Sequence, residues 1–366
     1  MRTIVVAYCA MLALASQQRT PDFYSAAIEK YVAGDVDAAV DALAQVSQAD
    51  IQKAIETSVA AVGSNGAGIS ARRRLDAIAM LHTEYALVGA ANPKEALFHV
   101  DMAHRSLLIS RGSITDQLPG VDDAERRRAR EFLPHWYALA ASASLSFYAD
   151  QNALTLVDEG LKQFREDRKL LFWRGLVLEF HAVWVGTPAI DPTAAVPAMR
   201  SKDPTGFDLL TNTRVWGPVE EAYRRVIHGD ADNAAAHLHL GYALYSLRRY
   251  VDAKTEYQLA RDRSTDTFVV YVADLLLAKL DEEQNDLKDA VPYYEHAIAK
   301  MPGAQSAYVG LGSVEARLGD AQRARELTEH LATIPERQRV RDPWWAFHTL
   351  RIPADDLDWL RAAVRQ

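Results

Sequence analysis

The chain has almost no cysteine, and this scarcity excludes several kinds of chemistry. Its 366 residues include a single cysteine, Cys9. One thiol can form neither an internal disulfide nor a cysteine-rich zinc site. Cys9 also lies in an apolar run that we interpret below as a cleaved signal. We therefore expect a mature chain without thiols, and hence without thiolate catalysis.

Positive charge is also in short supply. Lys and Arg number 41 against 49 Asp and Glu, which gives a net charge of −8 and a pI of about 5.8. Such a chain has no overall positive field to attract phosphates or an anionic bilayer, so we expect no nucleic-acid partner. The one arginine run, Arg126–Arg128, has Glu125 and Glu131 close by. It is typical of a solvated helix face, with a small anion patch as the alternative.

Long apolar runs are missing, and only the amino terminus resembles a targeting segment. No run reaches the about 18 apolar residues of a membrane span, so we expect no stable membrane insertion of the mature chain. Met1-Arg2 gives a positive start, Ile4–Leu14 is apolar, and Ala13-Leu14-Ala15 resembles a cleavage site. We predict that residues 1–15 are a signal peptide and that the protein is exported, with the periplasm as its compartment. A short buried helix in a cytoplasmic protein is the alternative.

Catalytic and metal-binding motifs are absent from the sequence as well. It has no Gly-Lys-Ser/Thr phosphate loop, no His-Glu-x-x-His and no Cys-x-x-Cys. His237 and His239 would point about 200° apart on a helix and could not bind one metal. His82, on an apolar helix beside Glu84, is interpreted as structural. We therefore expect no cofactor, no metal and no catalysis, although a site assembled from distant residues stays an alternative.

What the sequence does contain is one pattern written three times within residues 234–336. The step from His237 to Tyr271 is 34 residues, whereas that from Tyr257 to Tyr294 is 37. Three residues are thus inserted between the two halves of the second copy, while each half keeps its internal spacing. Such internal repetition predicts an array of helix–turn–helix units, each of which must cover the apolar face of its neighbour.

This pattern resembles the tetratricopeptide repeat, whose period is 34 residues. The residues that carry the resemblance are Leu240-Gly241, Ala253-x3-Tyr257, Ala290-x3-Tyr294, Pro302 and Leu311-Gly312. The sequence departs from the family pattern at His237, Asp274-Leu275 and Thr328. The resemblance implies an all-α fold, a right-handed α-solenoid of about seven helix pairs. Within it, Gly312→Leu should overpack the core and Tyr257→Ala should leave a cavity.

The same spacing, applied to the rest of the chain, predicts its organisation. The expected parts are N-terminal repeat-like helices at 20–62, degenerate repeat-like pairs at 70–165, a pair at 168–230, the three clear repeats at 234–336 and a C-terminal segment at 340–366. In the pair at 168–230, the small residue expected near position 187 is matched only by Val219. Residues 186–217 are therefore predicted to be an inserted loop, either functional or passive.

The C-terminal segment 340–366 is too apolar for a solvated tail, because it contains Trp344, Trp345, Phe347 and Trp359. We predict that it caps the open face of the last repeat, as stacked arrays require. The alternative is an exposed tryptophan-rich docking site.

The resemblance also implies a function, because family members generally bind peptides or proteins in a concave groove lined by the first helices of the repeats. The residues that should face this groove are Leu238, Tyr242, Tyr245, Val272, Leu276, Val309, Ser313 and Arg317. Only Arg317 fits the family's carboxylate clamp, so an apolar or aromatic segment of a protein partner is the expected ligand. Alternatively, the C-terminal segment or a neighbouring repeat fills the groove. Two other hypotheses remain, an enzyme or enzyme subunit that uses residues 186–217 as a lid and a carrier of an apolar ligand.

Overall fold

A computed structural model describes residues 23–64, 69–111, 123–186, 209–335, 342–347 and 354–365. All regular secondary structure in these ranges is helical, which confirms the predicted all-α class. The predicted signal peptide, Cys9 and most of the predicted insertion lie outside the described residues, so the lid hypothesis does too. None of the described helices combines the length and the apolar character that crossing a bilayer requires.

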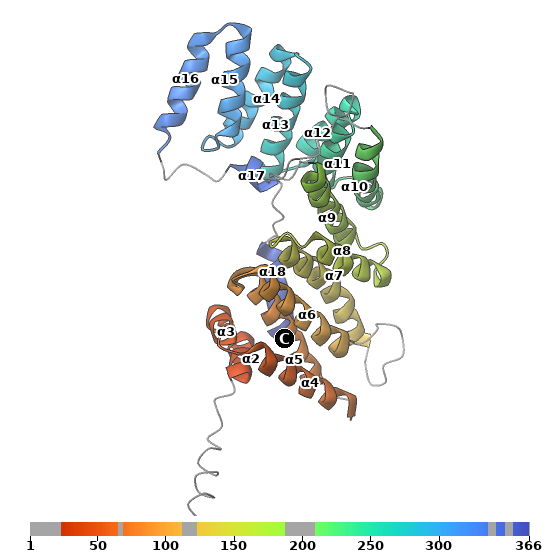
Figure 1. Cartoon of the computed structure of the whole chain (residues 1–366). Coiled ribbons are helices and arrows are strands. Elements are labelled where there is room, and N and C mark those ends of the chain that lie inside the picture. Colours follow the sequence, from red (N-terminus) through yellow and green to blue (C-terminus); the bar gives the residue numbers. More distant parts are fainter. Residues whose placement is uncertain are drawn as a thin grey trace, which may run out of the picture. The chain divides into compact units, whose positions relative to one another are not determined.

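The chain divides into two compact units (Figure 1). Unit 1 comprises residues 1–149 and 352–366, and unit 2 comprises residues 150–351. The elements of unit 1 are α2 (Phe23–Ala33), α3 (Val36–Leu43), α4 (Gln48–Ser64), α5 (Ile69–Glu84), the π-helical turn η1 (Tyr85–Gly89), α6 (Pro93–Arg111), α7 (Asp123–Leu145) and α18 (Ala354–Arg365). Those of unit 2 are α8 (Asp150–Gln163), α9 (Arg168–Gly186), α10 (Leu209–Gly229), α11 (Ala234–Ser246), α12 (Tyr250–Arg263), α13 (Thr267–Glu283), α14 (Leu287–Lys300), α15 (Ser306–Leu318), α16 (Ala321–Thr333) and α17 (Pro343–Phe347).

In unit 2 consecutive helices pack against one another from α8 to α16. The repeats that the sequence predicts are the pairs α11/α12, α13/α14 and α15/α16 (Figure 1). Polar residues begin these helices, because a side-chain oxygen accepts from a backbone amide that has no partner within the helix. Asn233 accepts from Ala236 at 2.9 Å, Asp266 from Phe268 at 2.8 Å and Asp320 from Arg323 at 2.9 Å.

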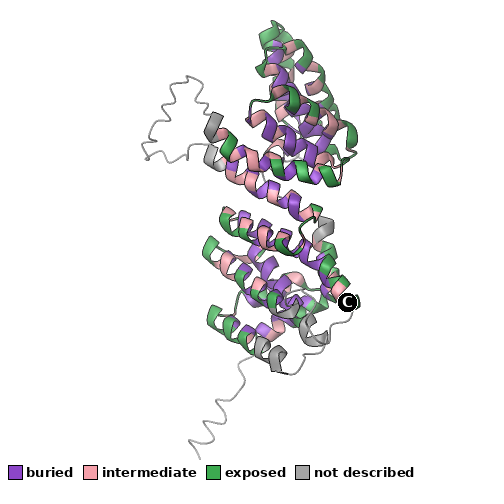
Figure 2. Cartoon of the chain, turned by 90° about the vertical axis from the view of Figure 1, so that its right-hand side faces the viewer, coloured by how far each residue is buried: buried purple, intermediate pink, exposed green. Residues whose placement is uncertain are grey.

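The repeated small and aromatic residues form the interior of this array. Ala253, Tyr257 and Ala260 are fully buried, and Tyr294 is 4% exposed. Figure 2 shows such buried residues on the inner sides of the helices, with exposed residues on the outer sides. A Cβ atom at Gly241 would lie 2.5 Å from the ring of Tyr257, so glycine is what lets the two helices approach closely. This pairing is the physical basis of the repeat.

Gly312 does not behave as its place in the repeat predicts. A Cβ atom there would meet only the carbonyl oxygen of Ala324, at 3.7 Å, an ordinary contact. The reason is that Thr328 stands where the other copies have tyrosine, so no ring presses on Gly312. In the second copy Leu275 takes the glycine position, and Tyr294 lies against Gly310 of α15 instead. Gly310, rather than Gly312, is the tightly packed glycine of this repeat.

The pair α9/α10 lies next to this array, with its helices packed on each other. Val219, Tyr223 and Val226 of α10 are fully buried, in line with the match at Val219. The helix begins at Leu209, however, so residues 209–217 belong to α10 and not to the predicted inserted loop. Pro218 lies inside this helix.

Unit 1 begins with a pair of similar design, α2/α3. Gly34 ends α2 with a φ of 98°, a conformation that glycine adopts without strain, and Asp35 accepts from Ala38 at 3.2 Å to begin α3. Farther on, α5 packs along α6, and α7 continues as one helix through Pro134. A proline in a helix interior removes a backbone hydrogen bond and commonly kinks or breaks the helix.

The described parts of the C-terminal segment, residues 342–347 and 354–365, do not form the cap that the sequence predicts over the last repeat. Helix α17 packs on α13 of unit 2, whereas α18 packs on α5, α7 and α2 of unit 1. In α18 Leu360 and Val364 are buried, and Trp359 stacks on His135 with 4.5 Å between ring centroids. Helix α16, at the end of the array, has no buried residue. The buried apolar residues that the structure describes in this segment are therefore covered in two places, Phe347 in unit 2 and Leu360 and Val364 in unit 1.

Candidate peptide-binding face

The first helices of the three repeats, α11, α13 and α15, form a continuous surface that we call the first-helix face. Helix α13 contacts both α11 and α15, while the second helices pack between successive first helices. The eight predicted groove residues all lie on these three helices, but at different depths. Leu238, Val272 and Leu276 are buried, Tyr242 and Tyr245 are partly buried, and Val309, Ser313 and Arg317 are exposed.

The two tyrosines of α11 form the aromatic part of this face. Tyr242 and Tyr245 stack with 6.4 Å between their ring centroids, and Trp216 of α10 meets Tyr242 edge-on at 5.6 Å. The hydroxyl of Tyr245 donates to Glu283 at 2.5 Å. Burial raises the pKa of both tyrosines, and nearby carboxylates, Glu179 for Tyr242 and Glu283 for Tyr245, raise it further. Both hydroxyls therefore stay protonated and act as hydrogen-bond groups.

Glu282 brings two other predicted residues together at the C-terminal end of α13. It accepts from Arg317 at 3.0 Å and from Ser313 at 3.4 Å, and the hydroxyl of Tyr294 donates to it at 2.9 Å. Arg317 donates in addition to Asn285 at 3.2 Å. The cationic group that could have clamped a partner's carboxylate is thus paired with a carboxylate of its own chain. Val309 lies nearer the N-terminal end of α15 and is 61% exposed.

The first-helix face carries a piece of the chain itself, residues 342–347. The Asp342 carboxylate accepts from the backbone amides of Gln305 and Ser306, at 2.8 and 2.6 Å, where α15 begins. It also accepts from the hydroxyl of Tyr271 at 3.4 Å. Gln305 makes no capping hydrogen bond with its own side chain, so Asp342 serves as the cap of α15 from a distance in sequence.

Aromatic contacts hold the other end of the 342–347 segment. Phe347 is 4% exposed and stacks on His239 with 4.7 Å between centroids at an angle of 16°. It meets the edge of Tyr242 at 5.5 Å. The ammonium group of Lys279 lies 5.3 Å from the ring centroid of Trp344, a cation–π distance.

Beneath Phe347 lies a buried polar group that joins three helices. Glu179 of α9 is 4% exposed and accepts from the hydroxyl of Tyr223 at 2.8 Å, with Nδ1 of His239 at 2.9 Å from the same oxygen. Burial and the neighbouring Glu179 raise the pKa of Tyr223 well above its usual value. This network fixes the His239 ring in the orientation in which Phe347 stacks on it.

Sequence reasoning therefore finds part of this surface and misses part. Of the eight predicted residues, Tyr242 has a specific contact with the 342–347 segment. Tyr271, Lys279 and His239 also hold the segment and were not predicted as groove residues. Tyr271 occupies a position that the repeat pattern assigns to the core, and His239 was considered only as a metal ligand. The only available signal was the concentration of aromatic residues in the C-terminal segment.

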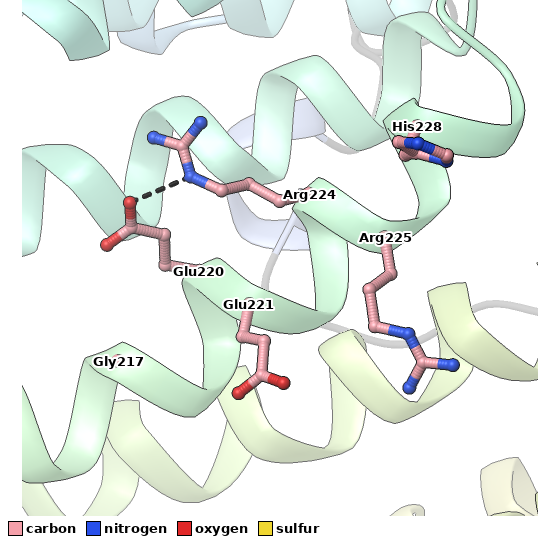
Figure 3. A pocket seen from close by; sticks show the side chains of 6 residues that line it. All are labelled: Gly217, Glu220, Glu221, Arg224, Arg225 and His228. Atoms are coloured by element: carbon pink, nitrogen blue, oxygen red, sulfur yellow. Dashed lines mark hydrogen bonds and ion pairs between the residues drawn. The ribbon is translucent and has the colours of Figure 1, made fainter.

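A pocket elsewhere on unit 2 is a weaker candidate for a binding site. A shallow pocket of about 390 Å³ on α10 is lined by Gly217, Glu220, Glu221, Arg224, Arg225 and His228 (Figure 3). Three of its charged side chains are already paired, since Arg224 lies 2.9 Å from Glu220 and Arg225 lies 3.3 Å from Glu166. Across the described part of the chain, no group of three or more His, Cys, Asp or Glu side chains is placed to hold a metal ion.

Comparison with known proteins agrees with this architecture. A family model described as a tetratricopeptide repeat matches residues 220–266 and 275–332, which include the end of α10 and most of the three pairs. These residues of the chain contain tetratricopeptide repeats. No curated protein matches it.

Several solved structures are similar to this chain, all at low identity. PilF of Pseudomonas aeruginosa is 13% identical with a TM-score of 0.44, covering 63% of this chain and 90% of its own. MamA of Desulfovibrio magneticus RS-1, from residue 41 to its end, is 14% identical with a TM-score of 0.40, covering 57% and 97%. YrrB, described as a TPR protein with an unusual peptide-binding site, is 15% identical with a TM-score of 0.37, covering 59% and 93%.

Proposed function

We propose that this protein is a scaffold that binds a segment of a partner protein on the first-helix face of α11, α13 and α15, and that it has no catalysis of its own. Tetratricopeptide repeats support a role in protein–protein interaction in general. The observation that best supports this particular face is that it already accommodates six residues of polypeptide. Backbone amides satisfy a carboxylate there, and aromatic rings enclose a phenyl ring.

In this proposal the predicted groove residues have different tasks. Tyr242 and Tyr245 supply aromatic surface of the kind that contributes most to binding at interfaces. Val309, Ser313 and Arg317 form an exposed rim farther along the array. Leu238, Val272 and Leu276 are buried and support the face from beneath.

The test is recovery of a partner by variants of the full chain. Tyr242→Ala combined with Tyr245→Ala should lower recovery of a defined partner by at least about tenfold, as loss of interface aromatics does. Tyr293→Ala, on the second helix α14, is the matched control and should leave recovery unchanged. Equal recovery by all three proteins, each with a native helical circular dichroism spectrum, would reject this face as the binding site.

We also propose that the protein is exported, with the periplasm as its compartment. The apolar run Ile4–Leu14 and the small residues Ala13 and Ala15 support this proposal. Intact-mass measurement on protein made in its native host should give a chain that begins at Ser16. A mature chain that retains residues 1–15 would contradict the proposal.

A further inference from the structure

The 342–347 segment meets the first-helix face in the way that a bound peptide would. Its first anchor is Asp342, which is 6% exposed and whose carboxylate accepts from two backbone amides at the start of α15. Free amides and the helix dipole make such a site favourable for an anion. The other carboxylate oxygen accepts from the amide of Trp344 at 2.9 Å and begins α17. The anchor thus both binds the face and orders the segment.

The second anchor is Phe347, five positions after Asp342. Its ring stacks on His239 and makes an edge contact with Tyr242, two residues that are neighbours on one face of α11. Between the anchors, Trp344 lies within cation–π distance of Lys279 on α13. The face therefore selects three features in order, namely a carboxylate, an aromatic ring beside a cation, and a second aromatic ring in an aromatic pocket.

The segment itself is poorly suited to hold this position without the face. Helix α17 has only five residues, far fewer than an isolated helix needs for stability in water. Its covalent attachment instead keeps it at a high effective concentration, which for a short linker is on the order of millimolar. A tethered segment of this kind occupies the site by default and lowers the apparent affinity of any competitor.

We propose that residues 342–347 are an internal ligand, and that the partner protein presents a segment of the same chemistry, an acidic residue followed five positions later by an aromatic residue, which displaces it. This inference rests on the proposed function. It adds the kind of partner sequence that the face would bind. It also adds a form of regulation, because the rate and the affinity of partner binding are limited by release of residues 342–347.

The probe is a fluorescein-labelled peptide with the sequence of residues 340–349, followed by fluorescence anisotropy. Full-length Asp342→Asn/Phe347→Ala protein, in which the internal ligand is weakened, should bind the peptide at least about tenfold more tightly than the wild-type chain. A peptide with the same two changes should not bind. Asp342→Asn alone, which changes no volume, replaces the double variant if that variant does not fold.

Two further variants locate the binding on the face. With the internal ligand weakened, Lys279→Ala should reduce affinity for the peptide severalfold, as loss of a cation–π contact does. Lys288→Ala on α14, another exposed lysine, should not change it. Equal peptide affinity of the wild-type chain and the ligand-weakened variant, both with native helical spectra, would overturn the inference. So would a wild-type dimer that disappears in the ligand-weakened variant, because the occupant would then be a second copy of this chain.

The outcomes separate this inference from the proposed function. If the peptide fails to bind while partner recovery still depends on Tyr242 and Tyr245, the internal-ligand inference falls and the binding face stands. If the peptide binds as expected while partner recovery is insensitive to these tyrosines, the proposed function falls instead.

Discussion

At the scale of single residues, tyrosine rings packed against glycines set the spacing of the helix pairs. Gly175 faces Tyr223 and Gly241 faces Tyr257, with no room for a Cβ atom in either place. The sequence predicts this arrangement at Gly241, where the family pattern is intact. It fails at Gly312, because the missing partner ring at Thr328 changes what surrounds the glycine.

This difference predicts opposite effects of the same substitution. Gly241→Ala should lower the free energy of unfolding by about 1–3 kcal/mol, because the Tyr257 ring must move. Gly312→Ala should be neutral or stabilising by up to about 1 kcal/mol, because alanine favours helix and fits the space. Urea unfolding of the two variants checks the prediction. A larger loss at Gly312 than at Gly241 would contradict the packing described.

A buried histidine pair in unit 1 makes stability depend on pH. Nδ1 of His82 lies 2.8 Å from Nδ1 of His99, and Nε2 of His82 lies 3.0 Å from the hydroxyl of Tyr24. Burial lowers the pKa of His99 to about 4, and burial together with His99 lowers the pKa of His82 well below its usual value. Both rings are therefore neutral in the folded protein at neutral pH. The sequence predicts a structural role for His82 but not its pairing with a residue on another helix.

The sign of the pH effect follows from these lowered pKa values. Below about pH 6.5 the unfolded chain binds protons at both histidines while the folded chain does not. The stability contributed by the neutral pair is therefore complete above that pH and is lost as the pH falls toward 4, by up to about 1.4 kcal/mol per pH unit for each ring. Urea unfolding between pH 7 and 4.5 should show a steeper loss in the wild-type chain than in His82→Leu/His99→Leu. Equal slopes would contradict this account.

At the scale of elements, the spacing of repeats predicts which neighbouring helices pair but not where the C-terminal helix packs. Pairing depends on local periodicity, which a sequence displays directly. The destination of α18 depends on contacts such as that between Arg361 and Glu84, which are 277 residues apart and follow no period. The cap prediction was wrong for this reason. An apolar sequence shows that a helix is buried, but it does not show which other helices bury it.

The ion pair between α18 and α5 yields a stability prediction. Glu84 is 2% exposed, accepts from the Tyr31 hydroxyl at 2.5 Å and is bound by Arg361 at 2.6 Å. Arg361→Gln should destabilise unit 1 by about 3 kcal/mol, because a buried carboxylate loses its charged partner. Arg365→Gln, one turn later and exposed, is the control and should cost little. Equal effects of the two changes on thermal unfolding would show that the ion pair does not hold α18 in place.

At the scale of the whole molecule, the fold and the class of function follow from the repeated pattern, whereas the detail of the binding face does not. The period of the repeat places Tyr242, Tyr245 and Val309 on the first helices of the repeats. Periodicity carries no information on which segment of the chain lies over them. Two complete repeats separate the 342–347 segment from α11 in the sequence. No local sequence pattern therefore indicates its contact with His239, which only the folded chain shows.

The most direct test of the account is site-specific photo-crosslinking in the native host. A photo-reactive residue at Val309, exposed on the first-helix face, should form crosslinks to a partner protein, mapped by mass spectrometry to a segment with an acidic residue ahead of an aromatic one. The same residue at Val251, which is 82% exposed on the second helix α12, should not. Crosslinks from Val251 and none from Val309 would contradict the claim that partners bind the first-helix face.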